Sequence, residues 1–228
     1  MSPLPRPVCA VLFDWDGTLA DTVPLVTAAT NRTLERHGYP HVSTEDVHDG
    51  MRFPTVERML YHIRHTTRTG DGALGRELAD EFYEHADQLG HRYVELFAGV
   101  RQLLATISEL GLPMGIVTNN MGSVVRSLLR HFSLQEFFPV VVAEENVTNP
   151  KPDPEGLVMA LRTLDTDACC ALFVGDSVTD AEAAVVAGVT PVGAGWPEAS
   201  IVHKPGNPYQ YIYSTPEGLR DAIVRSTQ

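Results

Sequence analysis

The stretch VLFDWDGTLADT, residues 11–22, decides the fold of this chain. An apolar run over 8–13 ends here on two aspartates, Asp14 and Asp16, which are separated by one residue. Short apolar runs bounded by proline and by charge are typical of strands that are buried on both faces of a parallel sheet. The stretch therefore predicts a buried first strand with two carboxylates at its carboxyl end.

Further apolar runs follow later in the chain, and helical stretches separate them. The runs lie at 113–117, 139–143, 171–174 and 191–194, and the tail over 211–224 predicts a last short strand and a helix. Strands that alternate with helices predict right-handed crossovers and a parallel sheet. The predicted fold class is α/β, with a doubly wound, Rossmann-like core.

The residues between the first strand and Gly99 differ from the rest of the chain in composition and in hydrophobic pattern. They form helical stretches rich in Arg, His and Glu, separated by Gly and Pro, and they show no strand pattern. Because this block interrupts the alternation of strands and helices, it is interpreted as an insertion. We predict a core formed by 1–20 and 98–228, and an inserted all-helical cap domain over 21–97.

Composition limits the classes of partner. The 228 residues include 17 Lys and Arg against 29 Asp and Glu, which gives a formal net charge of −12. An acidic surface repels phosphate backbones, so nucleic acid is not an expected partner. Three cysteines without a CxxC pair indicate reduced thiols. The apolar stretch near the start is too short for a signal peptide, and no run approaches the length of a membrane span, so we expect neither. These features predict a cytoplasmic protein with no membrane partner.

Four loops in the α/β part carry polar side chains. Each group on its own is typical of a turn, a helix cap or a solvated loop. In open α/β sheets, however, the carboxyl ends of the strands meet at one edge, where ligands bind. That edge would bring together carboxylates, a hydroxyl and an ammonium group. The candidates are Asp14, Asp16, Thr118, Lys151, Asp176 and Asp180.

Such a set of groups suits phosphoryl transfer. Clustered carboxylates repel one another, so a hard cation is needed, and Mg²⁺ prefers a few carboxylates together with water and phosphate oxygens. A cation, a lysine and a hydroxyl around one point can hold a phosphoryl group. One carboxylate can attack phosphorus. A second carboxylate, two residues on, can exchange a proton with the leaving oxygen and later with water.

These residues resemble the motifs of the haloacid dehalogenase (HAD) superfamily, on its phosphatase side. The segment DWDGT, 14–18, resembles the first motif, DxDGT, and Thr118 resembles the second. Lys151 in NPKPDPEG resembles the third motif, and GDSVTD, 175–180, resembles the fourth. The motifs occur in the family's order over nearly the whole chain. The resemblance implies a Rossmann-like HAD core, a helical cap after the first motif, and phosphoric monoester hydrolase activity.

The resemblance also implies a role for each motif residue. Asp14 would be the nucleophile and a metal ligand. Asp16 would be the general acid/base, and its backbone carbonyl would also ligate the metal. Thr118 and Lys151 would hold the phosphoryl oxygens, and Lys151 would restrain the carboxylate of Asp14. Asp176 would bind Mg²⁺ directly.

Other site residues are expected around this centre. Asp180 would bind the metal through a water molecule, or would contact the residues that bind the metal directly. Gly17, Thr18 and Asn119 are expected to contact the substrate. Arg52 lies in a cap loop, where its guanidinium could hold a substrate carboxylate or a distal phosphate, or could be a solvated side chain beside a helix start.

Several activities share this set of residues. A Mg²⁺-dependent phosphatase acting on a small phosphorylated metabolite is favoured, similar to the phosphoglycolate phosphatase-like group, because Asp16 is present and the fourth motif reads GDS. A phosphosugar mutase of the β-phosphoglucomutase kind and an inorganic pyrophosphatase of the same fold are the alternative enzymes. A regulatory protein that binds a phosphorylated metabolite is the non-enzyme alternative. A monomer or weak homodimer is expected.

The cap block also contains histidines and arginines outside the motifs. His62 and His65 are three positions apart on a predicted helix, but no HExxH motif or carboxylate partner accompanies them. We therefore expect surface histidines rather than a second metal site. Arg58, Arg64 and Arg68 are expected to belong to the polar face of the cap.

Overall fold

The structure is a computed structural model of the chain, and it describes residues 4, 7–51, 53–64, 72–197, 200–203 and 206–227. The chain divides into two compact units. Unit 1 comprises Met1–Asp21, Leu96–Gly122 and Phe132–Gln228, and unit 2 comprises Thr22–Glu95 and Ser123–His131. Each unit is described by itself, and the boundaries predicted above for core and cap stay a prediction.

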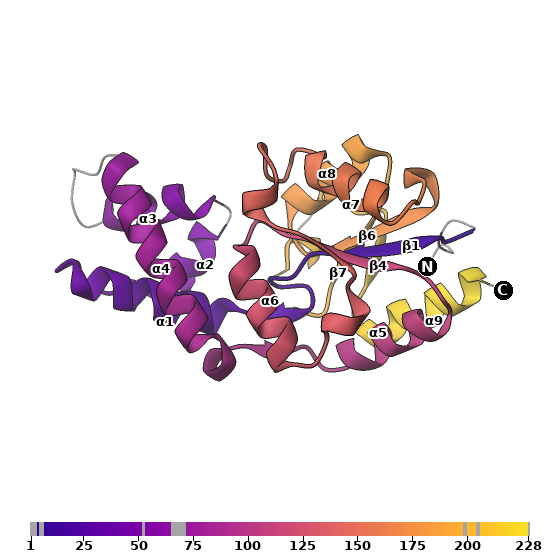
Figure 1. Ribbon diagram of the computed structural model, residues 1–228, viewed down its shortest axis with the longest axis horizontal. Coiled ribbons are helices and arrows are strands. Elements are labelled where there is room, and N and C mark those ends of the chain that lie inside the picture. Colours follow the sequence, from indigo (N-terminus) through magenta and orange to yellow (C-terminus); the bar gives the residue numbers. More distant parts are fainter. Residues whose placement is uncertain are drawn as a thin grey trace. The chain divides into compact units, whose positions relative to one another are not determined.

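Unit 1 is built on a six-stranded sheet in which neighbouring strands run parallel (Figure 1). The order across the sheet is β5-β4-β1-β6-β7-β8. The strands are β1 (Ala10–Phe13), β4 (Met114–Val117), β5 (Val140–Val142), β6 (Ala171–Gly175), β7 (Thr190–Ala194) and β8 (Tyr211–Tyr213). The chain winds from β1 through β4 to β5 on one side and from β6 to β8 on the other. The predicted fold class is thereby confirmed.

Strand β1 lies at the point where the winding reverses. Phe13 pairs with Ile116 of β4 on one side and with Val174 of β6 on the other. All four residues of β1 are fully buried, which explains why its sequence is continuously apolar rather than alternating. The chain emerges from β1, β4 and β6 at the same edge of the sheet, so the loops that follow these strands meet there.

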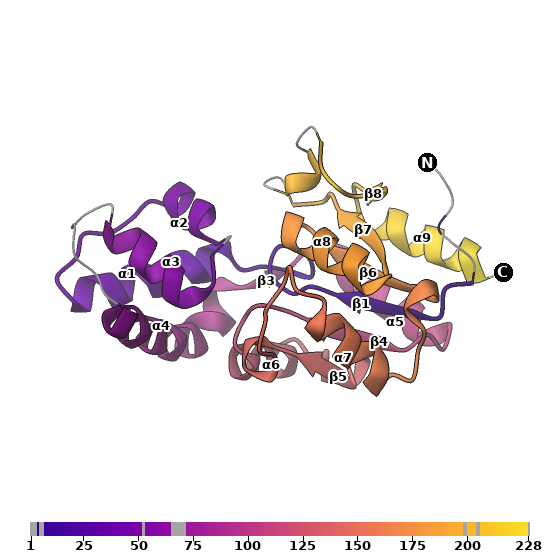
Figure 2. The same ribbon diagram turned by 90° about the horizontal axis from the view of Figure 1, so that it is seen from above.

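Helices cover both faces of this sheet, with α7 and α8 on one face and α5 and α9 on the other (Figures 1 and 2). The helices are α5 (Val100–Glu109), α7 (Glu155–Thr163), α8 (Val178–Ala187) and α9 (Pro216–Thr227). Leu12, Leu157, Phe173 and Ala184 belong to one buried cluster between α7, α8 and the sheet. Burial of each larger side chain stabilises the fold by about 1.5–3 kcal/mol, so the strand ends have a rigid support.

Unit 2 is helical in the part of it that the structure describes. It contains α1 (Val23–Arg36), α2 (Thr44–Gly50), α3 (Thr55–Arg64), α4 (Gly72–Tyr93) and all but the first residue of α6 (Gly122–His131). Helix α2 begins with a capping box, in which the side chains of Ser43 and Asp46 each accept a bond from the backbone N–H of the other residue. None of the described helices is long and apolar enough to span a membrane.

Three short elements, two strands and a helix, were not expected from the sequence. A second sheet pairs β2 (Ala20–Asp21) with β3 (Glu95–Leu96), and each of these strands has only two residues. Helix α2 has seven residues. Elements of this length are shorter than the window over which hydrophobic periodicity can be recognised, so the sequence pattern cannot reveal them.

Two expectations for unit 2 were wrong. His62 is buried rather than on the surface, and Arg58 is buried rather than on a polar face. Arg58 and His62 are one helical turn apart, so both lie on the side of α3 that is turned inward. The guanidinium of Arg58 stacks over the ring of Phe82 on α4, at 4.6 Å from the ring centroid. This cation–π contact makes burial of the charge tolerable.

Candidate active site

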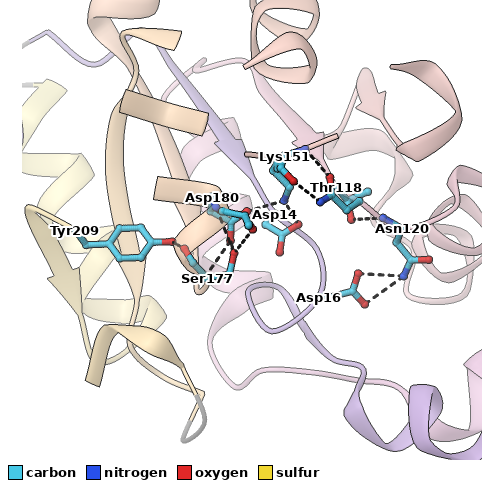
Figure 3. Close-up of polar contacts among 10 residues, drawn as sticks. Asp14, Asp16, Thr118, Asn120, Lys151, Ser177, Asp180 and Tyr209 are labelled. Carbon is cyan, nitrogen blue, oxygen red and sulfur yellow. Dashed lines mark hydrogen bonds and ion pairs between the residues drawn. The ribbon is translucent and has the colours of Figure 1, made fainter. Parts of the chain in front are cut away.

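The carboxylate of Asp14 lies directly after β1 and is almost completely buried. Its backbone N–H donates to the carbonyl of Val174 on β6, so the sheet ladder fixes the position of the residue. The ammonium group of Lys151 donates to Oδ1 of Asp14 at 2.7 Å and to Oδ1 of Asp180 at 2.6 Å (Figure 3). The structure thus brings together three of the residues that the motifs predicted.

The loop before α7 positions Lys151. The side-chain amide of Asn119 bonds twice to its backbone, because Oδ1 accepts from the N–H of Lys151 and Nδ2 donates to its carbonyl, each at 2.9 Å. At the first position of α7, the Glu155 carboxylate accepts hydrogen bonds from the backbone N–H groups of Thr148 and Asn149, and these bonds lower the pKa of Glu155. Asn119, expected to contact substrate, is therefore engaged with the lysine loop.

The start of α8 positions Asp180. Ser177 is the N-cap of this helix, and its hydroxyl donates to Oδ2 of Asp180 at 2.6 Å while accepting from the backbone N–H of the same residue. One oxygen of the Asp180 carboxylate therefore caps the helix and the other binds Lys151. The hydroxyl of Tyr209 donates to the Ser177 carbonyl at 2.7 Å, and Ser200 donates to the Asp176 carbonyl at 3.2 Å.

Three carboxylates, those of Asp14, Asp176 and Asp180, lie with one oxygen each within 4.8 Å of one another. Burial, partly offset by Lys151, raises the pKa of Asp14 from 3.8 to about 7. Burial and the neighbouring charges of Asp180 and Asp14 raise the pKa of Asp176 well above its ordinary value. One ammonium group lies among three carboxylates, so the cluster keeps excess negative charge when all three are ionised. A group of buried carboxylate oxygens with excess negative charge fits a hard divalent cation.

The other half of the site follows β4. Thr118 is buried, its backbone N–H donates to Val142 on β5, and its Oγ1 accepts from the backbone N–H of Asn120 at 3.1 Å. The amide of Asn120 donates to both carboxylate oxygens of Asp16, at 3.0 and 3.2 Å. Asp16 is half-buried, and Figure 3 shows its side chain turned toward Asn120.

The remaining predicted residues have different positions. Gly17 forms a tight turn with φ of +71°, and Thr18 is fully buried, with its carbonyl accepting from the indole N–H of Trp196 at 2.8 Å. Arg52 lies outside the described residues, as do His65 and Arg68. The substrate contacts expected of Gly17, Thr18 and Arg52, and the surface positions expected of His65 and Arg68, stay predictions.

Sequence reasoning missed several residues of this site. Ser177 could have been found, because Ser177 and Asp180 have the S-x-x-D spacing of a capping box. Asn120, Tyr209 and Trp196 left no such signal. Their side chains reach residues 104, 32 and 178 positions away in the sequence. A contact between distant segments has no local pattern in the sequence.

The sequence was compared with protein families and with individual proteins. The family model described as haloacid dehalogenase-like hydrolase matches residues 11–194. The chain belongs to this family. The matched stretch contains Asp14, Thr118, Lys151 and Asp176, which are the residues that the structure places at the carboxyl edge of the sheet.

This hydrolase is similar to named phosphatases over most of its length. It is 31% identical over 222 residues to an N-acetylmuramic acid 6-phosphate phosphatase from Pseudomonas aeruginosa, covering 95% of each chain. It is 32% identical over 189 residues to a phosphoglycolate phosphatase from Cupriavidus necator, covering 83% of this chain and 81% of the relative. Among solved structures, CbbY from Rhodobacter sphaeroides in complex with phosphate is 25% identical, with a TM-score of 0.79 over 93% of this chain and 96% of that one.

Gly17 of the hydrolase provides a first prediction. A Cβ at this position would lie 2.5 Å from Oδ2 of Asp176, so Gly17→Ala must displace that carboxylate. We expect Mg²⁺ affinity, measured by calorimetry, to fall by about tenfold or more, as when groups that orient metal ligands are changed. Gly111→Ala is the matched control, because Gly111 has the same φ of +71° but a Cβ there would meet no atom within 4 Å. An equal loss of metal affinity in both variants would contradict the prediction.

The raised pKa values predict how pH affects the metal-free hydrolase. Since the folded state holds the proton of Asp14 with a pKa of about 7 rather than 3.8, it binds more protons than the unfolded state between these values. The free energy of unfolding in EDTA should therefore fall as the pH rises from 5 to 8. A divalent cation such as Mg²⁺ would bind the ionised carboxylates, so we expect its stabilising effect to grow over the same range.

Urea denaturation at several pH values, with EDTA and with Mg²⁺, measures this effect. Burial lowers the pKa of His85, so the unfolded state binds more protons than the folded state near pH 6.5. His85 alone would therefore make the free energy of unfolding rise with pH in this range. Comparison with Asp14→Asn isolates the part that Asp14 contributes. A pH dependence in EDTA that is identical in the wild type and in Asp14→Asn would contradict the prediction.

Proposed function

We propose that this protein, a phosphatase of the haloacid dehalogenase-like family, hydrolyses a small-molecule phosphate monoester through an aspartyl-phosphate on Asp14. The observation that carries the proposal is the bridge of Lys151 between Asp14 and Asp180 within the buried carboxylate cluster. The lysine fixes one oxygen of Asp14 and adds positive charge where a phosphoryl group would arrive. Such a centre stabilises the charge that spreads over the equatorial oxygens during transfer.

In the first step, a carboxylate oxygen of Asp14 attacks phosphorus. The bond from phosphorus to the ester oxygen breaks, its electron pair stays on that oxygen, and Asp16 gives the oxygen a proton. The alcohol then leaves. Thr118 and Lys151 are proposed to hold the phosphoryl oxygens through this step, because both are buried at the same edge of the sheet.

In the second step, water attacks the phosphorus of the aspartyl-phosphate. Asp16, now ionised, takes a proton from the water as the bond between phosphorus and the Asp14 oxygen breaks. Inorganic phosphate leaves, and Asp14 returns as a carboxylate. Asp16 thus acts first as an acid and then as a base, which restores its own starting state after each cycle.

The proposed cofactor is Mg²⁺, held by Asp14 and Asp176, with Asp180 beside them and the backbone carbonyl of Asp16 as a further ligand. When bound, Mg²⁺ would neutralise the cluster and polarise a phosphoryl oxygen. Carboxylate oxygens are the donors that this ion prefers. The raised pKa values of Asp14 and Asp176 are consistent with the proposal, because burial disfavours their ionised forms and a bound cation would stabilise those forms.

The names of the relatives narrow the proposed substrate. Phosphoglycolate and N-acetylmuramic acid 6-phosphate are both phosphate esters of primary alcohols, and both carry a carboxylate elsewhere in the molecule. We propose a substrate of this chemistry, with Arg52 as the candidate partner of the carboxylate. A cytoplasmic location stays a prediction from composition, and a monomer or weak homodimer stays an expectation.

A panel of phosphate esters tests this function. We expect phosphate release that requires Mg²⁺, stops with EDTA, and is faster for phosphoglycolate and N-acetylmuramic acid 6-phosphate than for glucose 6-phosphate, which has no carboxylate. Pyrophosphate and a sugar 1-phosphate with its bisphosphate complete the panel. An isomerised sugar phosphate would favour the mutase instead, preferential cleavage of pyrophosphate would favour the pyrophosphatase, and tight binding without turnover would favour a regulatory protein.

A further inference from the structure

Every polar group of Asn120 is engaged in the structure. Its backbone N–H donates to Oγ1 of Thr118 at 3.1 Å, and its carbonyl accepts from the backbone N–H of Glu144 at 3.1 Å. Its side-chain oxygen accepts from the backbone N–H of Met121 at 2.8 Å. The residue is therefore held from two strand ends, those of β4 and β5, and its backbone has a single position.

The bond from Met121 also fixes which way the amide faces. Because the side-chain oxygen accepts from a backbone N–H, the NH₂ group must point the other way, and there it donates to both oxygens of Asp16. In the described part of the chain, these two bonds are the hydrogen bonds that the structure gives to the Asp16 carboxylate. The pair joins the turn after β1 to the loop after β4 (Figure 3).

We propose that Asn120 is the positioning residue of the general acid/base: its amide holds the Asp16 carboxylate where the ester oxygen of the substrate leaves. The inference rests on the proposed function, because it takes Asp16 as the proton donor. A general acid must lie within hydrogen-bond reach of the oxygen that it protonates. A carboxylate on a turn would sample several orientations, and two bonds from a fixed amide restrict it to one.

If Asn120 positions the general acid, the effect of losing it on the hydrolysis rate should depend on the leaving group of the substrate. An alkyl alcohol is a poor leaving group and needs its proton during bond breaking, whereas 4-nitrophenolate leaves without one. Loss of Asn120 should therefore slow hydrolysis of alkyl phosphates and have little effect on 4-nitrophenyl phosphate. A residue that merely supported the fold would slow both reactions alike.

The test compares kcat/KM for phosphoglycolate and for 4-nitrophenyl phosphate, at saturating Mg²⁺, in the wild type and four variants. For Asn120→Ala we expect a fall of about 100-fold on the alkyl ester and of less than about threefold on the aryl ester. Asn120→Asp keeps the acceptor for Met121 but places a carboxylate against Asp16, so it should show the same pattern even if Asn120→Ala folds poorly. Asp16→Asn should show the pattern more strongly.

Asn119→Ala is the matched control from the neighbouring position. Asn119 bonds to the backbone of Lys151 rather than to Asp16, so its loss should slow both esters equally. Equal slowing of both esters in the Asn120 variants, or no slowing of either, would overturn the inference. A wild type with no Asp14-dependent release from either ester would instead overturn the proposed function, and the inference with it.

Discussion

Asp14→Asn should abolish turnover, lowering kcat for the best phosphate ester by about four orders of magnitude or more. The amide of asparagine is a poor nucleophile and cannot form the acyl phosphate of the proposed first step. The substitution also removes a proposed metal ligand and one partner of Lys151, while Asp180 still pairs with the lysine. Phosphate release by single-turnover and steady-state assays measures the loss.

The fold should survive this change. Asp14 is buried with a pKa raised to about 7, so the neutral asparagine removes a charge that burial disfavours, and the metal-free variant should melt no lower than the wild type at pH 8. Asp87→Asn, at an exposed position of α4, is the matched control and should keep full activity. Activity of Asp14→Asn within tenfold of the wild type would show that another group attacks phosphorus.

The sheet and the motif residues could be predicted because their signals are local. Strands such as β1 and β6 are buried on both faces, so their sequences are short apolar runs that end abruptly on Asp14 and just before Asp176. In a parallel sheet every such run ends at the same edge. Placing Asp14, Thr118, Lys151 and Asp176 in one crevice therefore requires only the strand order in the chain, without knowledge of any side-chain contact.

The supporting contacts could not be predicted because they depend on side-chain direction. Asn119 and Asn120 are identical neighbours, yet one bonds to the lysine loop and the other to Asp16. Sequence reasoning chose the first as a substrate contact and passed over the second. Arg58 was misplaced for a similar reason, since its guanidinium stacks over Phe82, a residue of another helix that the local sequence around Arg58 does not reveal.

Lys151→Met should lower both activity and stability. The side chain is nearly isosteric but carries no charge, so the buried carboxylates of Asp14 and Asp180 lose their shared cation. Removing one partner of a buried ion pair costs about 3–5 kcal/mol, and we expect a loss of this order in the free energy of unfolding in EDTA at pH 8. The loss should shrink at pH 5, where Asp14, with its pKa already raised, takes up a proton.

For catalysis we expect kcat/KM to fall by about a thousandfold, because the variant lacks a group that we propose to hold the transferring phosphoryl oxygens. Lys151→Arg is the informative control. It restores the positive charge, so it should recover much of the stability, but a planar guanidinium cannot reach both Oδ1 atoms as the compact ammonium does at 2.7 and 2.6 Å. Lys151→Arg should therefore recover much of the free energy of unfolding but little of the lost kcat/KM. Full activity in Lys151→Arg would show that charge alone, rather than the geometry of the bridge, determines the contribution of Lys151.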